Sequence, residues 1–139
     1  MTVEAATAAG FRTGLADSLL REIAEHLDGL VRTGERSAID LRSLPITAAD
    51  RTELEERLGR GDIEALLTTA GTSEVWETRY AGVWWVRHLG AGGKIAAERI
   101  EITTCPEILI SDAADIAAAS KRLTEDLIDH LSAEDADDA

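Results

Sequence analysis

The chain has 139 residues, of which 45% are hydrophobic and 29% are charged, and its formal net charge is −13. This length and composition suit one globular domain with a buried core. The negative charge argues against nonspecific binding to DNA, RNA or anionic lipid, because the phosphate groups of each would repel the protein.

Catalytic and metal-binding motifs are missing from the sequence. The single Cys105 excludes an internal disulfide and every CxxC motif, and His26, His88 and His130 are far apart. No phosphate-binding loop, dinucleotide fingerprint or nucleophile elbow is present. The glycine-rich stretch 90–94 lacks the spacing of a phosphate-binding loop and is typical of a hairpin turn. We therefore expect no cofactor, no metal and no catalytic residues.

No membrane span or export signal is expected. No run approaches the roughly 18 consecutive apolar residues of a spanning helix. Residues 1–14 lack a basic start followed by an apolar stretch, so we predict no secretory signal and a cytoplasmic location.

The first half of the chain predicts two helices. Apolar residues recur every three or four positions over 13–33, which indicates an amphipathic helix that Gly34 ends. A short extended segment at 39–44 leads through Pro45 to a second, shorter helix over 48–58. Thr47 and Asp50 have the spacing of a capping box at its start, and glycines at 59 and 61 end it.

The pattern then changes to the alternation of β-strands. Four strands are predicted near 62–69, 73–80, 83–89 and 94–104, with short glycine-containing links between them. Such links favour an antiparallel meander.

A last helix, over 113–132, carries apolar residues at 116, 123, 127 and 131. We therefore predict an α+β fold, in which a four-stranded antiparallel meander has all three helices packed on one face. The expected organisation is a flexible N-terminus over 1–12, a single domain over 13–131 and an acidic disordered tail over 132–139.

The three tryptophans all lie between residues 76 and 85. Neighbouring side chains of a strand point to opposite faces, so Trp84 and Trp85 must separate. We expect Trp85 to point inward, and Trp84 to point outward, beside Trp76 if the two strands pair. The outer indole is then either covered by neighbouring residues or part of an exposed patch for a protein partner. A base-stacking platform is disfavoured by the net charge.

Cys105 is the only candidate nucleophile of the thiol type. A lone cysteine is most often a small buried apolar residue. A reactive thiol needs an activating base, and His88 is the only histidine in the strand region. Glu107, next to Pro106, is expected to cap a backbone amide rather than to act as an acid.

Four motifs in order resemble the C-terminal domain of hydrogenase expression proteins of the HupH/HyaF type. They are Leu44-Pro45 before a helix, the Leu-Gly-x-Gly of 58–61, the Gly-Val-Trp-Trp-Val of 82–86 and the Pro-Glu-Ile-Leu of 106–109. The resemblance spans about residues 39–131.

The resemblance implies an accessory protein rather than an enzyme. Its expected role is that of a chaperone in the maturation of nickel–iron hydrogenase. We expect it to bind the iron–sulfur small subunit before assembly, and other maturation factors are further candidate partners. The alternatives are a structural subunit of a hydrogenase-associated complex, or a redox or iron–sulfur carrier that uses Cys105. A homodimer formed through the aromatic face is also open. The predicted docking surface consists of Trp76, Tyr80, Trp84, His88, Pro106, Glu107, Ile108 and Leu109.

Overall fold

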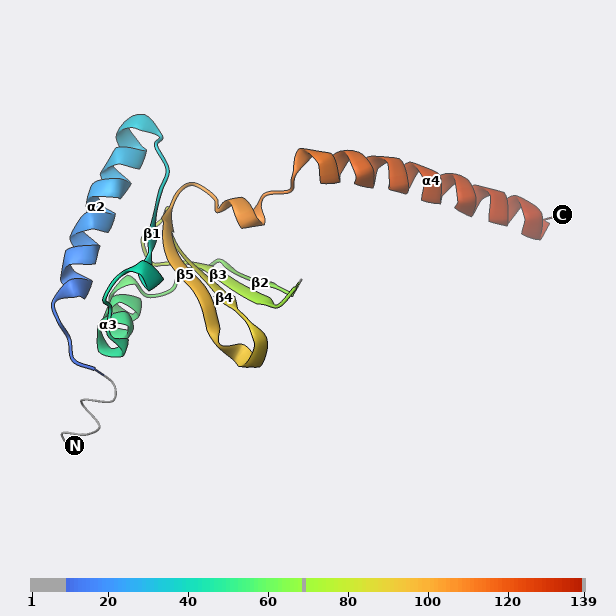
Figure 1. The fold of residues 1–139 in the computed structure, drawn as a ribbon. Coiled ribbons are helices and arrows are strands. Elements are labelled where there is room, and N and C mark those ends of the chain that lie inside the picture. The colour runs from blue at the N-terminus through green and yellow to red at the C-terminus, as the bar shows by residue number, and fades with distance from the viewer. Residues whose placement is uncertain (1–9, 69, 139) are drawn as a thin grey trace. The chain divides into compact units, whose positions relative to one another are not determined.

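A computed structural model describes residues 10–68 and 70–138 of the chain, shown in Figure 1. The described residues fall into two compact units, the first ending at Pro106 and the second beginning at Glu107. The first unit contains two helices and a sheet, and the second contains one long helix.

The first unit begins with two helices that the sequence predicted. Helix α2 spans Leu15–Thr33, and the amide of Gly34 donates a hydrogen bond to the carbonyl of Leu30 at 2.9 Å, which ends it. Helix α3 spans Ala48–Leu58 and begins with the predicted capping box. The Thr47 hydroxyl accepts from the Asp50 amide at 3.0 Å, and the Asp50 carboxylate accepts from the Thr47 amide at 3.3 Å.

Asp50 also holds the segment before α2. Its carboxylate accepts hydrogen bonds from the amide and the hydroxyl of Thr13, both at 2.7 Å. Burial alone would raise the pKa of Asp50, but these bonds and those from Thr47 outweigh it and leave the pKa below its ordinary value. Most of the predicted flexible N-terminus lies outside the described residues. Within the described part, the carbonyl of Phe11 accepts from the Thr47 hydroxyl at 2.7 Å.

The sheet has five antiparallel strands in the order β1-β5-β4-β3-β2. These strands are β1 Ser37–Asp40, β2 Glu64–Leu67, β3 Thr72–Glu77, β4 Val83–Leu89 and β5 Ile95–Ile102. The prediction of a four-stranded meander is therefore wrong by one strand. The short segment expected only to be extended forms β1, in which Ile39 faces Ile100 of β5. Four residues are too few for alternation to reveal a strand whose partner lies far along the chain.

Helices α2 and α3 lie on the same side of the sheet and cover one face of it (Figure 1). The core contains side chains from α2, α3, the strands β1, β3, β4 and β5, and the short 3-10 turn Leu41–Ser43 that follows β1. Its buried members are Ala16, Leu19, Ile23, Ile39, Leu41, Leu54, Leu58, Trp76, Val83, Trp85, Ile100 and Ile102. The predicted coverage of one face by these two helices is confirmed.

The second unit contains a short 3-10 turn, Glu107–Leu109, and helix α4, Ala113–Asp138. The acidic segment from Ser132, which we expected to be disordered, is helical up to Asp138. The packing of this helix on the sheet stays a prediction. Across the described ranges, none of the helices combines the length and the apolar character required to cross a membrane.

Candidate functional site

Trp76 and Trp85 face each other on the helix-covered side of the sheet. They are directly paired residues of β3 and β4. Their rings stack with centroids 5.6 Å apart and planes 7° apart, and both side chains are buried. The inward position predicted for Trp85 is confirmed. The prediction that Trp76 shares a face with Trp84 is wrong, because the register of the strand pair sets Trp76 opposite Trp85.

Trp84 lies on the other face of the sheet, as predicted, but it is only 4% exposed. Its indole N–H donates to the carbonyl of Thr103 at 3.1 Å. Val75 and Val86, which pair with each other on the same face, are fully buried. Both faces of the sheet are therefore covered at this point, which was the alternative to an exposed patch.

The other predicted docking residues belong to both units and differ in exposure. His88 is half-buried, and its Nδ1 lies 2.6 Å from the hydroxyl of Ser73. Pro106 is buried at the end of the first unit. In the second unit Glu107 is exposed, and Ile108 and Leu109 are half-buried. The predicted residues of the first unit do not form one surface, and their role in partner binding stays a prediction.

Tyr80 is the aromatic residue of this set that reaches solvent, with 51% of its surface exposed. It lines a pocket of about 260 Å³ between α2, the end of α3 and the β3–β4 turn. The lining is mostly aliphatic and consists of Leu20, Ile23, Ala24, Leu27, Arg57, Leu58, Tyr80 and Val83. An apolar concavity with few polar groups is the usual form of a binding site.

Arginines gather beside this pocket. A guanidinium nitrogen of Arg57 lies 3.3 Å from the Asp17 carboxylate, which also pairs with Arg21 at 3.0 Å. Arg79 donates to the main-chain carbonyl of Arg57 at 2.7 Å. Arg57 and Arg21 thus share one carboxylate, and Arg79 adds a third guanidinium nearby, although the chain as a whole carries a net charge of −13. Arginine beside an apolar pocket suits a partner surface that combines apolar and acidic groups.

Sequence reasoning selected Tyr80 but missed Arg57 and the two half-buried leucines of α2. Leu20 and Leu27 belong to the apolar stripe of α2 and pack against the core while also lining the pocket. Their position on that stripe marked them as core residues, and no pattern in the sequence distinguished them as the wall of a pocket.

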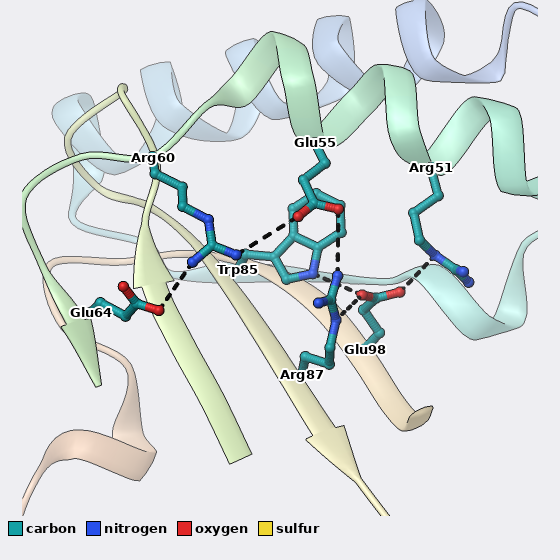
Figure 2. Close-up of polar contacts among 7 residues, drawn as sticks. All are labelled: Arg51, Glu55, Arg60, Glu64, Trp85, Arg87 and Glu98. Carbon is teal, nitrogen blue, oxygen red and sulfur yellow. Dashed lines mark hydrogen bonds and ion pairs between the residues drawn. The ribbon is translucent and has the colours of Figure 1, made fainter. Parts of the chain in front are cut away.

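A buried cluster of charges lies below α3 (Figure 2). The side chain of Glu98, on β5, is fully buried, and its Oε2 accepts from Arg87 at 2.8 Å and from the Trp85 indole at 2.9 Å. Its Oε1 lies 2.8 Å from Nε of Arg51. That contact is an ion pair without hydrogen-bond alignment.

The cluster continues outward to the edge of the sheet (Figure 2). Arg87 lies 3.5 Å from Glu55, which also lies 3.8 Å from Arg60. Arg60 pairs with Glu64 at 3.1 Å. The Arg60 guanidinium also lies 3.9 Å from the centre of the Trp76 ring, within the range of a cation–π contact.

This cluster fixes α3 to strands β4 and β5 through opposite charges. Each carboxylate faces at least one arginine, so the charges are paired within the cluster, although Nε of Arg51 and Oε1 of Glu98 make no hydrogen bond. The burial of Glu98 in this cluster could have been predicted from the sequence. Ile100 and Ile102 were predicted to share one face of their strand, and alternation puts Glu98 on that same buried face.

The described residues offer little for redox or metal chemistry. Within residues 10–68 and 70–138, no three histidine, cysteine or acidic side chains gather as a metal site would require. The Cys105 sulfur is 3.7 Å from the Pro106 carbonyl, and His88 contacts Ser73. The Cys105–His88 pair considered from the sequence therefore receives no support from these contacts.

The Leu-Gly-x-Gly motif connects α3 to the sheet. Gly59 has φ 62°, a conformation that side chains rarely adopt, at the end of α3. The Gly61 amide donates to the Glu77 carbonyl at 2.7 Å. A Cβ atom at Gly61 would lie 2.7 Å from the Thr78 carbonyl oxygen, so this close approach of two backbones requires glycine. Leu58 of the motif is buried in the core.

Comparisons with known proteins agree with these motifs. The family model described as "HupH hydrogenase expression protein, C-terminal conserved region" matches residues 15–129. A solved structure, the hydrogenase expression protein HupH from Thiobacillus denitrificans ATCC 25259, is similar with a TM-score of 0.82 and 44% identity. The match covers 86% of this chain and 99% of that one.

Curated relatives carry related names. The hydrogenase expression/formation protein HoxQ of Azotobacter vinelandii is 30% identical over 80% of this chain and 42% of its own length. HupH of Rhodobacter capsulatus is 30% identical over 66% of this chain and 34% of its own length. The hydrogenase-1 operon protein HyaF of Escherichia coli is 31% identical over 63% of this chain and 31% of its own length. The chain therefore spans less than half the length of these relatives.

The fold and the site define a small α+β domain with an apolar pocket beside a cluster of arginines. The chain belongs to the family of HupH hydrogenase expression proteins and corresponds to their C-terminal conserved region. The resemblance predicted from the sequence is confirmed.

Proposed function

We propose that this chain is an accessory protein in the maturation of nickel–iron hydrogenase, and that it binds the iron–sulfur small subunit before assembly. Family membership supports the hydrogenase context, because the relatives are named as hydrogenase expression or formation proteins. The proposal makes the chain a binding protein of the cytoplasm rather than an enzyme.

The observation that carries the binding role is the pocket beside Tyr80. A half-exposed aromatic ring next to aliphatic walls offers an anchor for a partner side chain. Arg57 at the same pocket adds a positive charge that steers an acidic group of the partner. The buried tryptophans then act indirectly, since they hold the sheet and the turn that present Tyr80.

The test is recovery of the small subunit with the chain as bait. The two proteins are co-expressed, the chain is captured by a tag, and the small subunit is quantified in the eluate for wild type, Tyr80→Ala and Leu66→Ala. Leu66 is a matched control, since it is 65% exposed but lies on β2, outside the pocket.

We expect Tyr80→Ala to reduce recovery about tenfold or more, as loss of an aromatic anchor does. Leu66→Ala should match wild type. Circular dichroism of each variant checks that the fold is retained. No recovery with the wild-type chain would refute the choice of partner, whereas equal recovery with wild type and a folded Tyr80→Ala would refute the pocket.

A further inference from the structure

Strand β2 forms one edge of the sheet, and among the described residues its outer side has no partner strand. The amide of Glu77 donates to the carbonyl of Ile63 at 3.0 Å, so the main chain of Ile63 faces β3. Successive residues of a strand direct their main-chain groups to opposite sides. The amides and carbonyls of Glu64 and Leu66 therefore point toward the free edge. In its described part the second unit contains only helical elements, so it offers no strand to pair with them.

The opposite edge of the sheet, strand β1, is closed by its own turn. The 3-10 turn Leu41–Ser43 follows β1 directly, and its Ser43 hydroxyl donates to the carbonyl of Asp40 at 2.9 Å. The Asp40 carboxylate accepts from the amide of Arg42 at 3.0 Å. Residues 63–68, by contrast, read Ile-Glu-Ala-Leu-Leu-Thr and contain neither proline nor lysine, the residues that commonly keep an edge strand from pairing.

The charges beside β2 indicate which partner this edge suits. Glu64 is exposed and pairs with Arg60 at 3.1 Å. Glu74, which lies opposite Leu66 on β3, is half-buried, and no basic side chain within the described ranges pairs with it. Asp62, just before the strand, adds another exposed carboxylate. In a chain with a net charge of −13, such an edge attracts a basic strand and repels a second copy of the same chain.

We propose that β2 accepts an extended, basic segment of another protein as an added strand of the sheet. Glu64 and Leu66 each supply an amide and a carbonyl, which match two alternate residues of an antiparallel strand. The partner residue opposite Glu64 is lysine or arginine, and the one opposite Leu66 is apolar. A contact made by so few hydrogen bonds is weak and transient. It is separate from the Tyr80 pocket and does not depend on the proposed hydrogenase partner.

The probe is the blocked peptide Thr-Val-Thr-Lys-Thr-Lys, whose antiparallel pairing sets its valine opposite Leu66 and its lysines opposite Glu64 and Asp62. Binding to the full chain is followed through the amide chemical shifts of the isotope-labelled protein. We expect saturable shifts centred on the amides of Glu64 and Leu66, and about tenfold weaker binding of the acidic counterpart Thr-Val-Thr-Glu-Thr-Glu. Absence of saturable shifts at these amides, or equal binding of the two peptides, would overturn the proposal.

Leu66→Pro tests the main-chain contact, because proline has no amide N–H. The Leu66 amide points away from β3, so the pairing of β2 with β3 should remain, and tryptophan fluorescence checks that it does. This variant should weaken binding about tenfold or more. Leu66→Val keeps the amide and an apolar side chain, and it should bind as wild type does. Equal binding by a folded Leu66→Pro would refute the added strand.

N-methylated peptides test the same contact on the unaltered chain. Methyl groups on the amides of the valine and the first lysine, which face β2, should abolish binding. A methyl group on the threonine between them should change little, because that amide points away from β2. Equal binding of these two peptides would rule out strand pairing. Light scattering tests the other occupant, since a wild-type dimer that Leu66→Pro converts to a monomer would show that the edge pairs with a second copy and would overturn the basic partner.

Discussion

Replacing Glu98 by Ala should destabilise the protein more than any change at an exposed charge. The substitution removes the acceptor of the Trp85 indole and the common carboxylate of Arg51 and Arg87. A buried donor left without a partner costs about 1–3 kcal/mol. Removing one member of a buried ion pair costs about 3–5 kcal/mol.

The two arginines are not fully buried, with side-chain exposures of 16% and 29%, so water can rehydrate part of their charge. The combined cost of the unpaired indole and the broken ion pairs is therefore smaller than for fully buried groups. We expect a loss of about 2–4 kcal/mol in the free energy of unfolding. For a domain of this size the midpoint of thermal unfolding should fall by about 8–15 °C.

The assay is urea denaturation followed by tryptophan fluorescence, with thermal unfolding as a second measurement. Glu64→Ala is the matched control, because Glu64 also pairs with an arginine but its side chain is 66% exposed. Exposed pairs are worth about 0–1 kcal/mol, so this control should change stability little. Equal free energies of unfolding for the two variants would refute the idea that the buried cluster fixes α3 to the sheet.

Three further predictions concern the first unit. The lowered pKa of Asp50 means that its ionised form stabilises the fold above about pH 3.8, and that this contribution is lost as the pH falls through the folded-state pKa. Urea titrations at several pH values should therefore show Asp50→Asn less stable than wild type at neutral pH, with the difference narrowing below pH 3.8; a constant difference would contradict the linkage. Gly61→Ala should cost about 1–3 kcal/mol, because its Cβ would meet a backbone oxygen that cannot move alone, and unchanged stability would mean that the turn shifts freely. Trp84→Ala should lose about 3–5 kcal/mol, because a buried indole and its hydrogen bond to Thr103 disappear, whereas a stable variant with weakened partner binding would restore an outer-face docking role.

Local patterns in the sequence predicted most of the elements. The capping box at Thr47 and Asp50 set the start of α3, and the strand over 83–89 was predicted with the bounds it has in β4. Strand β1 was missed because its stability comes from pairing with β5, a contact that no local pattern reports. The last helix runs past its expected end because an acidic composition does not by itself stop a helix.

The candidate site was less predictable from sequence. Alternation along β4 separated Trp84 from Trp85 correctly, but it carries no information on register, and register decided that Trp76 stacks on Trp85. Alternation also could not tell that Trp84 is covered. The pocket beside Tyr80 combines residues from α2, α3 and the β3–β4 turn, so it exists only once the helices pack on the sheet.

We propose that this domain binds the hydrogenase small subunit before assembly. Calorimetric titration of the purified chain with the unassembled small subunit, and separately with mature hydrogenase, tests it most directly. We expect saturable binding to the unassembled subunit that Tyr80→Ala weakens about tenfold or more, and no binding to the mature enzyme. Absence of heat with the unassembled subunit, or equal affinity for the mature enzyme, would contradict it.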